Sequence, residues 1–146
     1  MKRLLLGFFV IVTNMFIAEA RPSWLLRIIP NASSTGAICI DGSSPGFYYQ
    51  FSTAAEHKTD WIIFLEGGGL CNTESSCLYR ASTDLGSSKF WPKSVSGTIL
   101  DDGILSSKPE LNPDFWGFNM IYVMYCDGQA FSGNLDAPVS VGGKSL

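Results

Sequence analysis

The amino-acid sequence predicts an α/β fold on three observations. Residues 61–65 form a short, continuous apolar run, which is typical of a strand buried on both faces of a sheet. Three glycines at 67–69 follow this run and precede a stretch with helical spacing, an order that is typical of α/β enzymes. Residues 119–125 form a second apolar run, rich in strand-forming side chains, which again ends in a polar turn.

The first element along the chain is a predicted secretory signal peptide at residues 1–20. It has a basic start at positions 2–3, a mostly apolar stretch at 4–17 and an Ala-Glu-Ala cleavage pattern at 18–20. The apolar stretch is shorter than the roughly 20 residues of a membrane-spanning helix. We therefore expect a secreted, soluble mature chain, residues 21–146, with no membrane segment. An uncleaved anchor is the alternative.

The charge of the chain argues against one class of partner. Ten Lys and Arg stand against thirteen Asp and Glu, which gives a formal net charge of −3. Loss of residues 1–20 makes the remainder slightly more acidic. Nucleic-acid-binding proteins present a basic face, so we expect no nucleic-acid partner.

Four cysteines follow the predicted leader: Cys39, Cys71, Cys77 and Cys126. An even number in a secreted chain is typical of disulfides, and three pairings are possible. Cys71 and Cys77 are near enough in sequence to close a small loop after the glycines, and Cys39 would then pair with Cys126. A zinc site is the weaker alternative, because the chain has no CxxC pair and a single histidine. We expect no metal.

Asn31 begins an Asn-Ala-Ser sequon, which makes it a candidate glycosylation site. It lies in a polar stretch, residues 31–36, near the mature N-terminus, and such a stretch favours an exposed loop. The apolar run before it, residues 24–29, is brief and ends at Pro30.

The next elements are a hairpin and a helix. Residues 37–51 are expected to form the hairpin around a polar Gly/Pro turn at 41–46. The helix should begin after Asn72 or Thr73 as N-cap and end at Gly86. Apart from the second predicted strand, we expect the rest of the chain to be loops, with no domain boundary.

The glycine turn is the first candidate for chemistry. The N–H groups of Gly68 and Gly69, near a helix N-terminus, are suited to hold a developing oxyanion during acyl transfer. A phosphate is a second possible ligand, but neither GxxxxGK[ST] nor GxGxxG occurs in the chain. A tight turn without chemistry is the third interpretation.

The chain offers no clear nucleophile or base. It contains no GxSxG motif, and the nearest partial match is the sequence around Ser132. His57 lies in a polar loop before residues 61–65, and we interpret it as a surface residue. In hydrolases with a Ser, Asp, His order the oxyanion loop precedes all three residues, so His57 lies on the wrong side.

Two carboxylates and three aromatic residues have two interpretations each. Glu66 and Asp127 follow the predicted strands, either as acids or as structural carboxylates that bind turn N–H groups. Trp91, Phe115 and Trp116 either line a sugar or acyl site or belong to the core, and the core is the commoner place for aromatic residues.

Seven blocks of the sequence resemble the pectin acetylesterase/Notum family. They occur in the same order along essentially the whole mature chain: 39–48, 61–72, 77–80, 86–89, 103–106, 112–115, and 125–128 with 131–133. The resemblance implies the N-terminal portion of an α/β-hydrolase-like sheet with helices on its faces. It also implies removal of acyl groups from oxygen by a Ser-Asp-His triad, without a cofactor.

By this resemblance, Gly68 and Gly69 map to the oxyanion loop. The pairs Cys71–Cys77 and Cys39–Cys126 map to disulfides of the family, in agreement with the spacing argument. Leu70 departs from the pattern, because plant members usually carry Trp here and the Notum branch carries aromatic residues around this loop. The acyl pocket is therefore expected to differ.

The nucleophile block of the family lies beyond residue 146, so we expect a truncated chain without its triad and without activity by itself. Two substrates are compatible with the resemblance: acetylated pectin, and a fatty-acylated secreted protein. The triple glycine and residues 126–128 favour pectin, which implies an extracellular or cell-wall location. A secreted binding module without catalysis is the alternative from another class. An incomplete sheet also predicts marginal stability.

Overall fold

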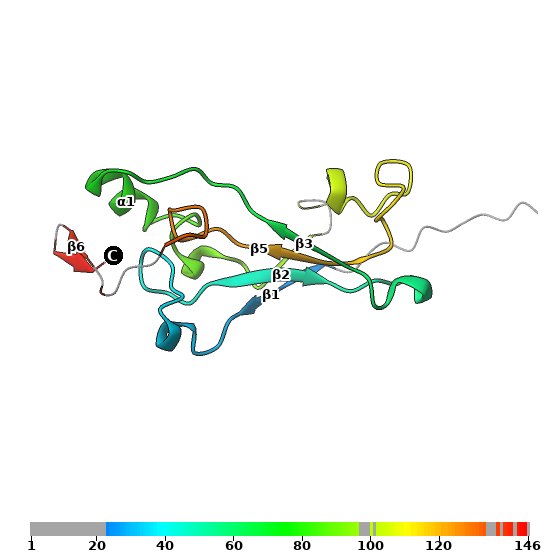
Figure 1. Ribbon diagram of the computed structural model, residues 1–146, viewed down its shortest axis with the longest axis horizontal. Helices are drawn as coiled ribbons and strands as arrows, with labels where there is room; N and C mark the ends of the chain where they lie inside the picture. Colours follow the sequence, from blue (N-terminus) through cyan, green and yellow to red (C-terminus); the bar gives the residue numbers. More distant parts are fainter. Residues whose placement is uncertain are drawn as a thin grey trace, which may run out of the picture.

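The computed structural model describes residues 23–96, 100, 102–133, 137, 139–141 and 143–145, so the predicted leader lies outside the described residues. A mixed five-stranded sheet forms the centre of the molecule, in the order β3-β5-β2-β1-β4 (Figure 1). The strands are β1 Trp24–Ile28, β2 Gly46–Gln50, β3 Trp61–Leu65, β4 Ser94–Val95 and β5 Asn119–Val123.

Both strands predicted from apolar runs form, and they are neighbours. β3 has the predicted bounds, and β5 ends at Val123, two residues earlier than expected. The two strands are parallel, with Ile62 opposite Met120 and Leu65 opposite Val123. The carboxyl ends of β3 and β5 therefore lie at the same edge of the sheet, and the loops after them are brought together.

The predicted hairpin at residues 37–51 is wrong. Its second arm is β2, but residues 37–40 are not a strand, and β2 pairs instead with β1 and β5, both antiparallel. The brief apolar run at 24–28 is thus a strand, which buries Trp24 to 1% exposure. Ile40 N–H donates to the Cys126 carbonyl instead of to β2, so this segment lies along the loop after β5.

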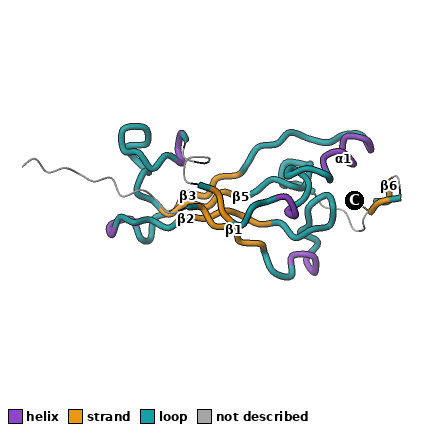
Figure 2. Tube along the Cα trace, turned by 180° about the vertical axis from the view of Figure 1, so that it is seen from behind, coloured by secondary structure: helices purple, strands orange, loops and turns teal. Residues whose placement is uncertain are grey.

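The predicted helix forms but is shorter than expected. α1 is Glu74–Arg80, and Thr73 caps it by accepting a hydrogen bond from the Ser76 N–H. The chain then turns before Gly86, where a Cβ atom would stand 2.3 Å from the Arg80 carbonyl oxygen. Gly86 is thus required by close packing after the helix, and it does not mark the helix end. α1 lies beyond the end of the sheet (Figures 1 and 2).

The remaining elements are small. They are the 3₁₀ helices Ala32–Thr35, Ala55–His57, Ser88–Phe90 and Gly103–Leu105, and a two-stranded sheet of β6 Ser140–Val141 and β7 Lys144–Ser145. Within the described ranges, none of the helices has the length and apolar character needed to cross a membrane.

One face of the central sheet packs into a core and the other is exposed. The core face contributes Trp24, Tyr48, Ile62 and Met120, all buried. On the opposite face of β3, Ile63 is 65% exposed, because no helix in the described part of the chain covers that face. The prediction that β3 is buried on both faces is therefore wrong for this chain.

Candidate functional site

Residues 66–71, called the glycine loop below, meet the loop after β5 at the carboxyl ends of strands β3 and β5. Cys71 N–H donates to the Gly128 carbonyl at 3.0 Å, and Tyr125 N–H donates to the Glu66 carboxylate at 2.7 Å. These contacts join residues 66–71 to the segment that follows Val123. This edge of parallel strands is where α/β proteins bind ligands.

The carbonyl groups of Gly68 and Gly69 accept hydrogen bonds from the protein, whereas the N–H groups of the same two residues have no acceptor among the described residues. Gly68 C=O accepts a hydrogen bond from Arg80 Nη1 at 2.7 Å, and Gly69 C=O accepts one from the Tyr125 hydroxyl. Within the part of the chain that the structure describes, the N–H groups of Gly68 and Gly69 donate to no protein acceptor. This arrangement suits donors that await a ligand oxygen.

Two of the three glycines are required by the local structure. A Cβ atom on Gly68 would stand 2.1 Å from the Tyr125 ring, and Gly69 has a φ of +69°, a conformation that other residues rarely adopt. Gly67 faces open space. The loop therefore approaches Tyr125 as closely as backbone allows, which brings bare peptide groups to the sheet edge.

Glu66 serves as a structural carboxylate, the second of its two interpretations. Its side chain accepts the Tyr125 N–H and is also hydrogen-bonded to Tyr122. Burial raises the pKa of Glu66, although these two hydrogen bonds oppose the effect. The pKa of Tyr122 rises to about 12 through burial and the neighbouring Glu66 charge.

Asp127 also binds turn N–H groups, as the structural interpretation holds. Its two carboxylate oxygens accept from Gln129 N–H and from Gly133 N–H, both at 3.2 Å. The exposed Ser132 hydroxyl donates to the Gln129 carbonyl within the same turn. The structure therefore gives Asp127 and Ser132 a local role in shaping the loop after β5.

His57 is half-buried, whereas the sequence-based interpretation placed it on the surface. Its side chain is 28% exposed, its Nδ1 lies 2.9 Å from the Asp60 carboxylate, and its ring packs 5.0 Å from that of Phe118. Gly117 approaches so closely that a Cβ atom there would meet the imidazole at 2.4 Å. The residue precedes β3, at the end of the sheet opposite the glycine loop.

The aromatic candidates do not converge on the glycine loop. Trp91 is buried, and its indole N–H donates to the Asp84 carbonyl at 2.8 Å, so the core interpretation applies to it. Phe115 packs edge-to-face on Phe118, and with Trp116 it belongs to the segment that enters β5 from the opposite end.

Both disulfides have the expected pairing. Cys71–Cys77 joins the end of the glycine loop to α1, and Cys39–Cys126 joins the segment before β2 to the loop after β5. All four cysteines are thereby removed as zinc ligands. The part of the chain that the structure describes contains no group of three or more metal-ligating side chains.

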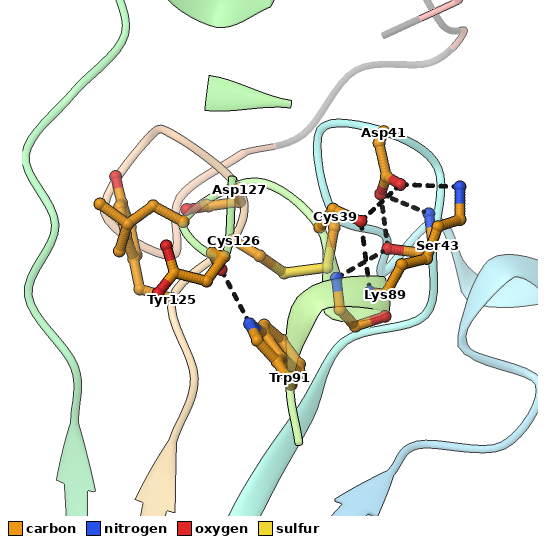
Figure 3. The surroundings of a disulfide bond; sticks show 12 residues. Cys39, Asp41, Ser43, Lys89, Trp91, Tyr125, Cys126 and Asp127 are labelled. Atoms are coloured by element: carbon orange, nitrogen blue, oxygen red, sulfur yellow. Dashed lines mark hydrogen bonds and ion pairs between the residues drawn. A yellow bond between two sulfur atoms is a disulfide. The ribbon is translucent and has the colours of Figure 1, made fainter. Parts of the chain in front are cut away.

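A largely but not fully buried carboxylate stabilises the region around Cys39–Cys126. Asp41 accepts hydrogen bonds from the Ser43 and Ser87 hydroxyls and lies 2.8 Å from Lys89 Nζ (Figure 3). Burial alone would raise the pKa of Asp41, but the hydrogen bonds, that of Lys89 foremost, lower it to about 2. The cluster ties residues 41–43 to residues 87–89.

Comparison with known proteins decides the family. A family model described as Pectinacetylesterase matches residues 18–141. The chain belongs to the pectinacetylesterase family. Pectin acetylesterases 5 and 4 of Arabidopsis thaliana are 41% and 42% identical to it over 112 residues, 77% of the chain. The mouse palmitoleoyl-protein carboxylesterase Notum is 42% identical over 110 residues, 74% of the chain.

The family resemblance and the α/β class inferred from the sequence are thus confirmed. The Wnt deacylase Notum from Drosophila has a similar structure, with a TM-score of 0.68 and 31% identity over 85% of this chain. The pectinacetylesterase-family chain spans 25% of the length of pectin acetylesterase 5, 20% of mouse Notum and 33% of the Drosophila structure. Identity alone does not separate the two branches.

Proposed function

We propose that residues 21–146 are the N-terminal part of a secreted carboxylic ester hydrolase that removes acetyl groups from pectin-type polysaccharide. The observation that carries the proposal is the pair of N–H groups at Gly68 and Gly69, which have no acceptor among the described residues and lie at the carboxyl edge of the sheet. Because the chain belongs to the pectinacetylesterase family, we assign these donors to the oxyanion that forms during ester hydrolysis.

In the proposed reaction, a serine hydroxyl gives its proton to histidine as its oxygen attacks the acyl carbon, and the carbonyl electron pair moves onto the acyl oxygen. The Gly68 and Gly69 N–H groups donate to this oxyanion, and one such donor lowers the barrier by about 3 kcal/mol. When the carbonyl re-forms, the sugar oxygen leaves with a proton from histidine, and water then releases acetate from the serine. The chain contains no GxSxG, so the proposal takes Ser, Asp and His from outside residues 1–146.

The choice of pectin as the substrate rests on the sequence of the glycine loop and of the turn after β5. Three consecutive glycines with the Cys-Asp-Gly turn favour the pectin branch. Leu70, 62% exposed beside the proposed donors, stands where plant members usually have an aromatic side chain. Hydrolysis of a palmitoleoyl ester on a secreted protein is the second candidate, because mouse Notum is as similar to this chain as the plant enzymes are.

The test is acetate release from acetylated pectin by the gene product expressed to its natural C-terminus, compared with residues 21–146 alone. We expect turnover by the natural-length product only. Hydrolysis of a palmitoleoylated serine peptide in place of pectin would support the second candidate. Carbohydrate binding without any turnover would indicate a binding module, and turnover by residues 21–146 alone would refute the proposed origin of the triad.

Secretion and glycosylation belong to the same proposal. Asn31 is exposed directly before the first 3₁₀ helix, and its side chain makes no capping hydrogen bond there. We expect the product recovered from the medium to begin near Arg21 and to carry a glycan that Asn31→Gln removes. Intact-mass measurement tests both points, and an unmodified mass that includes residues 1–20 would contradict them.

A further inference from the structure

The last turn of α1 places a positive charge directly behind the glycine loop. Arg80 is half-buried, its Nη1 donates to the Gly68 carbonyl at 2.7 Å, and its guanidinium carbon lies 5.8 Å from the centre of the Tyr125 ring. The Cys71–Cys77 disulfide ties α1 to the end of the same loop. Helix, disulfide and ring therefore hold the guanidinium in one place.

The hydrogen bond from Arg80 determines the direction of a neighbouring N–H group. Gly68 C=O and Gly69 N–H belong to one trans peptide unit, in which the two groups point in opposite directions. With its carbonyl bound to Arg80, this unit must point the Gly69 N–H away from α1. In the described structure, the peptide between Gly67 and Gly68 has no such anchor.

The peptide between Gly68 and Gly69 needs such an anchor because both residues are glycines. Gly68 and Gly69 have no Cβ atoms, so their peptide units rotate more freely than those of other residues. The Tyr125 hydroxyl holds the next carbonyl, that of Gly69, in the same manner. Together the two anchors fix the directions of the Gly68–Gly69 and Gly69–Leu70 peptides.

The charge of Arg80 has a second effect on the same peptide. Hydrogen bonds with an ionised donor are roughly twice as strong as neutral ones, and a carbonyl polarised in this way makes the N–H of its own peptide a better donor. The positive charge behind the peptide also favours negative charge in front of it. Both effects strengthen the Gly69 N–H as a donor to an oxyanion.

We propose that Arg80 is a positioning residue for ester hydrolysis: it aims and polarises the Gly69 N–H without touching the substrate. The inference rests on the proposed function, since it assigns Arg80 a role in holding the peptide whose N–H is the proposed oxyanion donor. Because the oxyanion forms only in the transition state, loss of Arg80 should lower kcat and leave KM nearly unchanged.

The first test measures acetate release by the natural-length gene product with Arg80→Gln, Arg80→Lys and the control Lys89→Gln. We expect kcat to fall about 10- to 100-fold for Arg80→Gln, short of the roughly 100- to 1,000-fold loss when a donor is removed outright. Arg80→Lys should retain part of the rate, and added guanidinium should restore part of it to Arg80→Gln. Lys89→Gln removes an equal charge from the Asp41 cluster and should leave kcat unchanged.

The second test does not depend on turnover. In protein labelled with ¹⁵N-glycine, Arg80→Gln should move the Gly69 amide proton resonance upfield and speed its exchange with solvent, whereas Lys89→Gln should do neither. An unchanged Gly69 amide, or an active enzyme whose kcat is insensitive to Arg80→Gln, would overturn the inference. An inactive natural-length product whose Gly69 amide still responds would refute the proposed function and retain the positioning effect.

Discussion

Gly68 shows how one missing side chain shapes the candidate site. The Tyr125 ring that it touches is only 1% exposed and cannot move easily, because its hydroxyl binds both Gly69 C=O and Ala130 N–H. Phe131 packs edge-to-face on the same ring at 5.4 Å. A Cβ atom at Gly68 would therefore displace the glycine loop and leave Tyr125 in place.

Replacement of Gly68 by Ala should accordingly damage both stability and catalysis. Overpacking against a fixed ring costs about 1–3 kcal/mol, and displaced oxyanion donors should lower kcat by about 100-fold. Gly67→Ala is the matched control, since its Cβ atom meets open space. Urea unfolding and acetate release measure the two effects, and equal behaviour of the two variants would contradict this account.

The lowered pKa of Asp41 predicts that the folded state loses stability in acid. Its folded pKa of about 2 lies below the ordinary value of 3.8, so the folded protein is stabilised by the ionised carboxylate above about pH 4. That stabilisation is lost as the pH falls from about 4 to about 2, because the proton then binds the folded state as well. The partners responsible are Lys89, Ser43 and Ser87.

Asp41→Asn should remove this acid-dependent contribution. The variant should be about 1–3 kcal/mol less stable than the wild type at pH 6, from the broken hydrogen bonds of a largely buried group. The difference should shrink between pH 4 and pH 2. Urea midpoints measured across this range test the prediction, and a difference that stays constant with pH would assign the effect to another group.

At the scale of elements, strand bounds could be predicted better than strand partners. The apolar pattern predicts β3 with its observed bounds, but pairs β2 with residues 37–40 when its partners are β1 and β5. A turn with Gly and Pro at 41–46 is compatible with a hairpin. Whether the hairpin forms depends on which backbone edge is free elsewhere, and β1, which precedes residues 37–40 in the chain, supplies one.

The two disulfides stabilise elements over very different chain lengths. Cys71–Cys77 closes a separation of 6 residues and Cys39–Cys126 one of 87. By loop-closure entropy, loss of the short bridge should cost about 2 kcal/mol and loss of the long one about 4–5 kcal/mol. Ser replacements of each pair, compared by urea unfolding, test this, and a larger cost for the short bridge would show that native contacts dominate.

At the scale of the whole molecule, the described residues cover the central sheet on one side only. Phe51, Trp61, Ile63 and Leu65 are each at least 45% exposed on the uncovered face. An exposed apolar face of this kind promotes association, and β3 also presents an unpaired edge of the sheet. Residues 21–146 alone should therefore be marginally stable and should self-associate.

Replacements at two adjacent residues of β3 should distinguish self-association from marginal stability. Ile63→Ser, on the uncovered face, should reduce self-association with little change in the unfolding free energy. Ile62→Ser, at 8% exposure in the core, should cost about 2–5 kcal/mol or prevent folding. Light scattering and urea unfolding distinguish the outcomes, and a sharp cooperative melt of monomeric wild-type residues 21–146 would contradict the expected marginal stability.

The sequence alone determined the features that depend on a few neighbouring residues: the span of β3, a helix cap at Asn72 or Thr73 and the glycine turn after Glu66. Local sterics and apolar periodicity suffice for these. The tertiary structure decided the half-buried state of His57 and the direction of the Gly69 N–H. Those depend on hydrogen bonds and ring contacts between residues 12 to 61 positions apart, which no local pattern encodes.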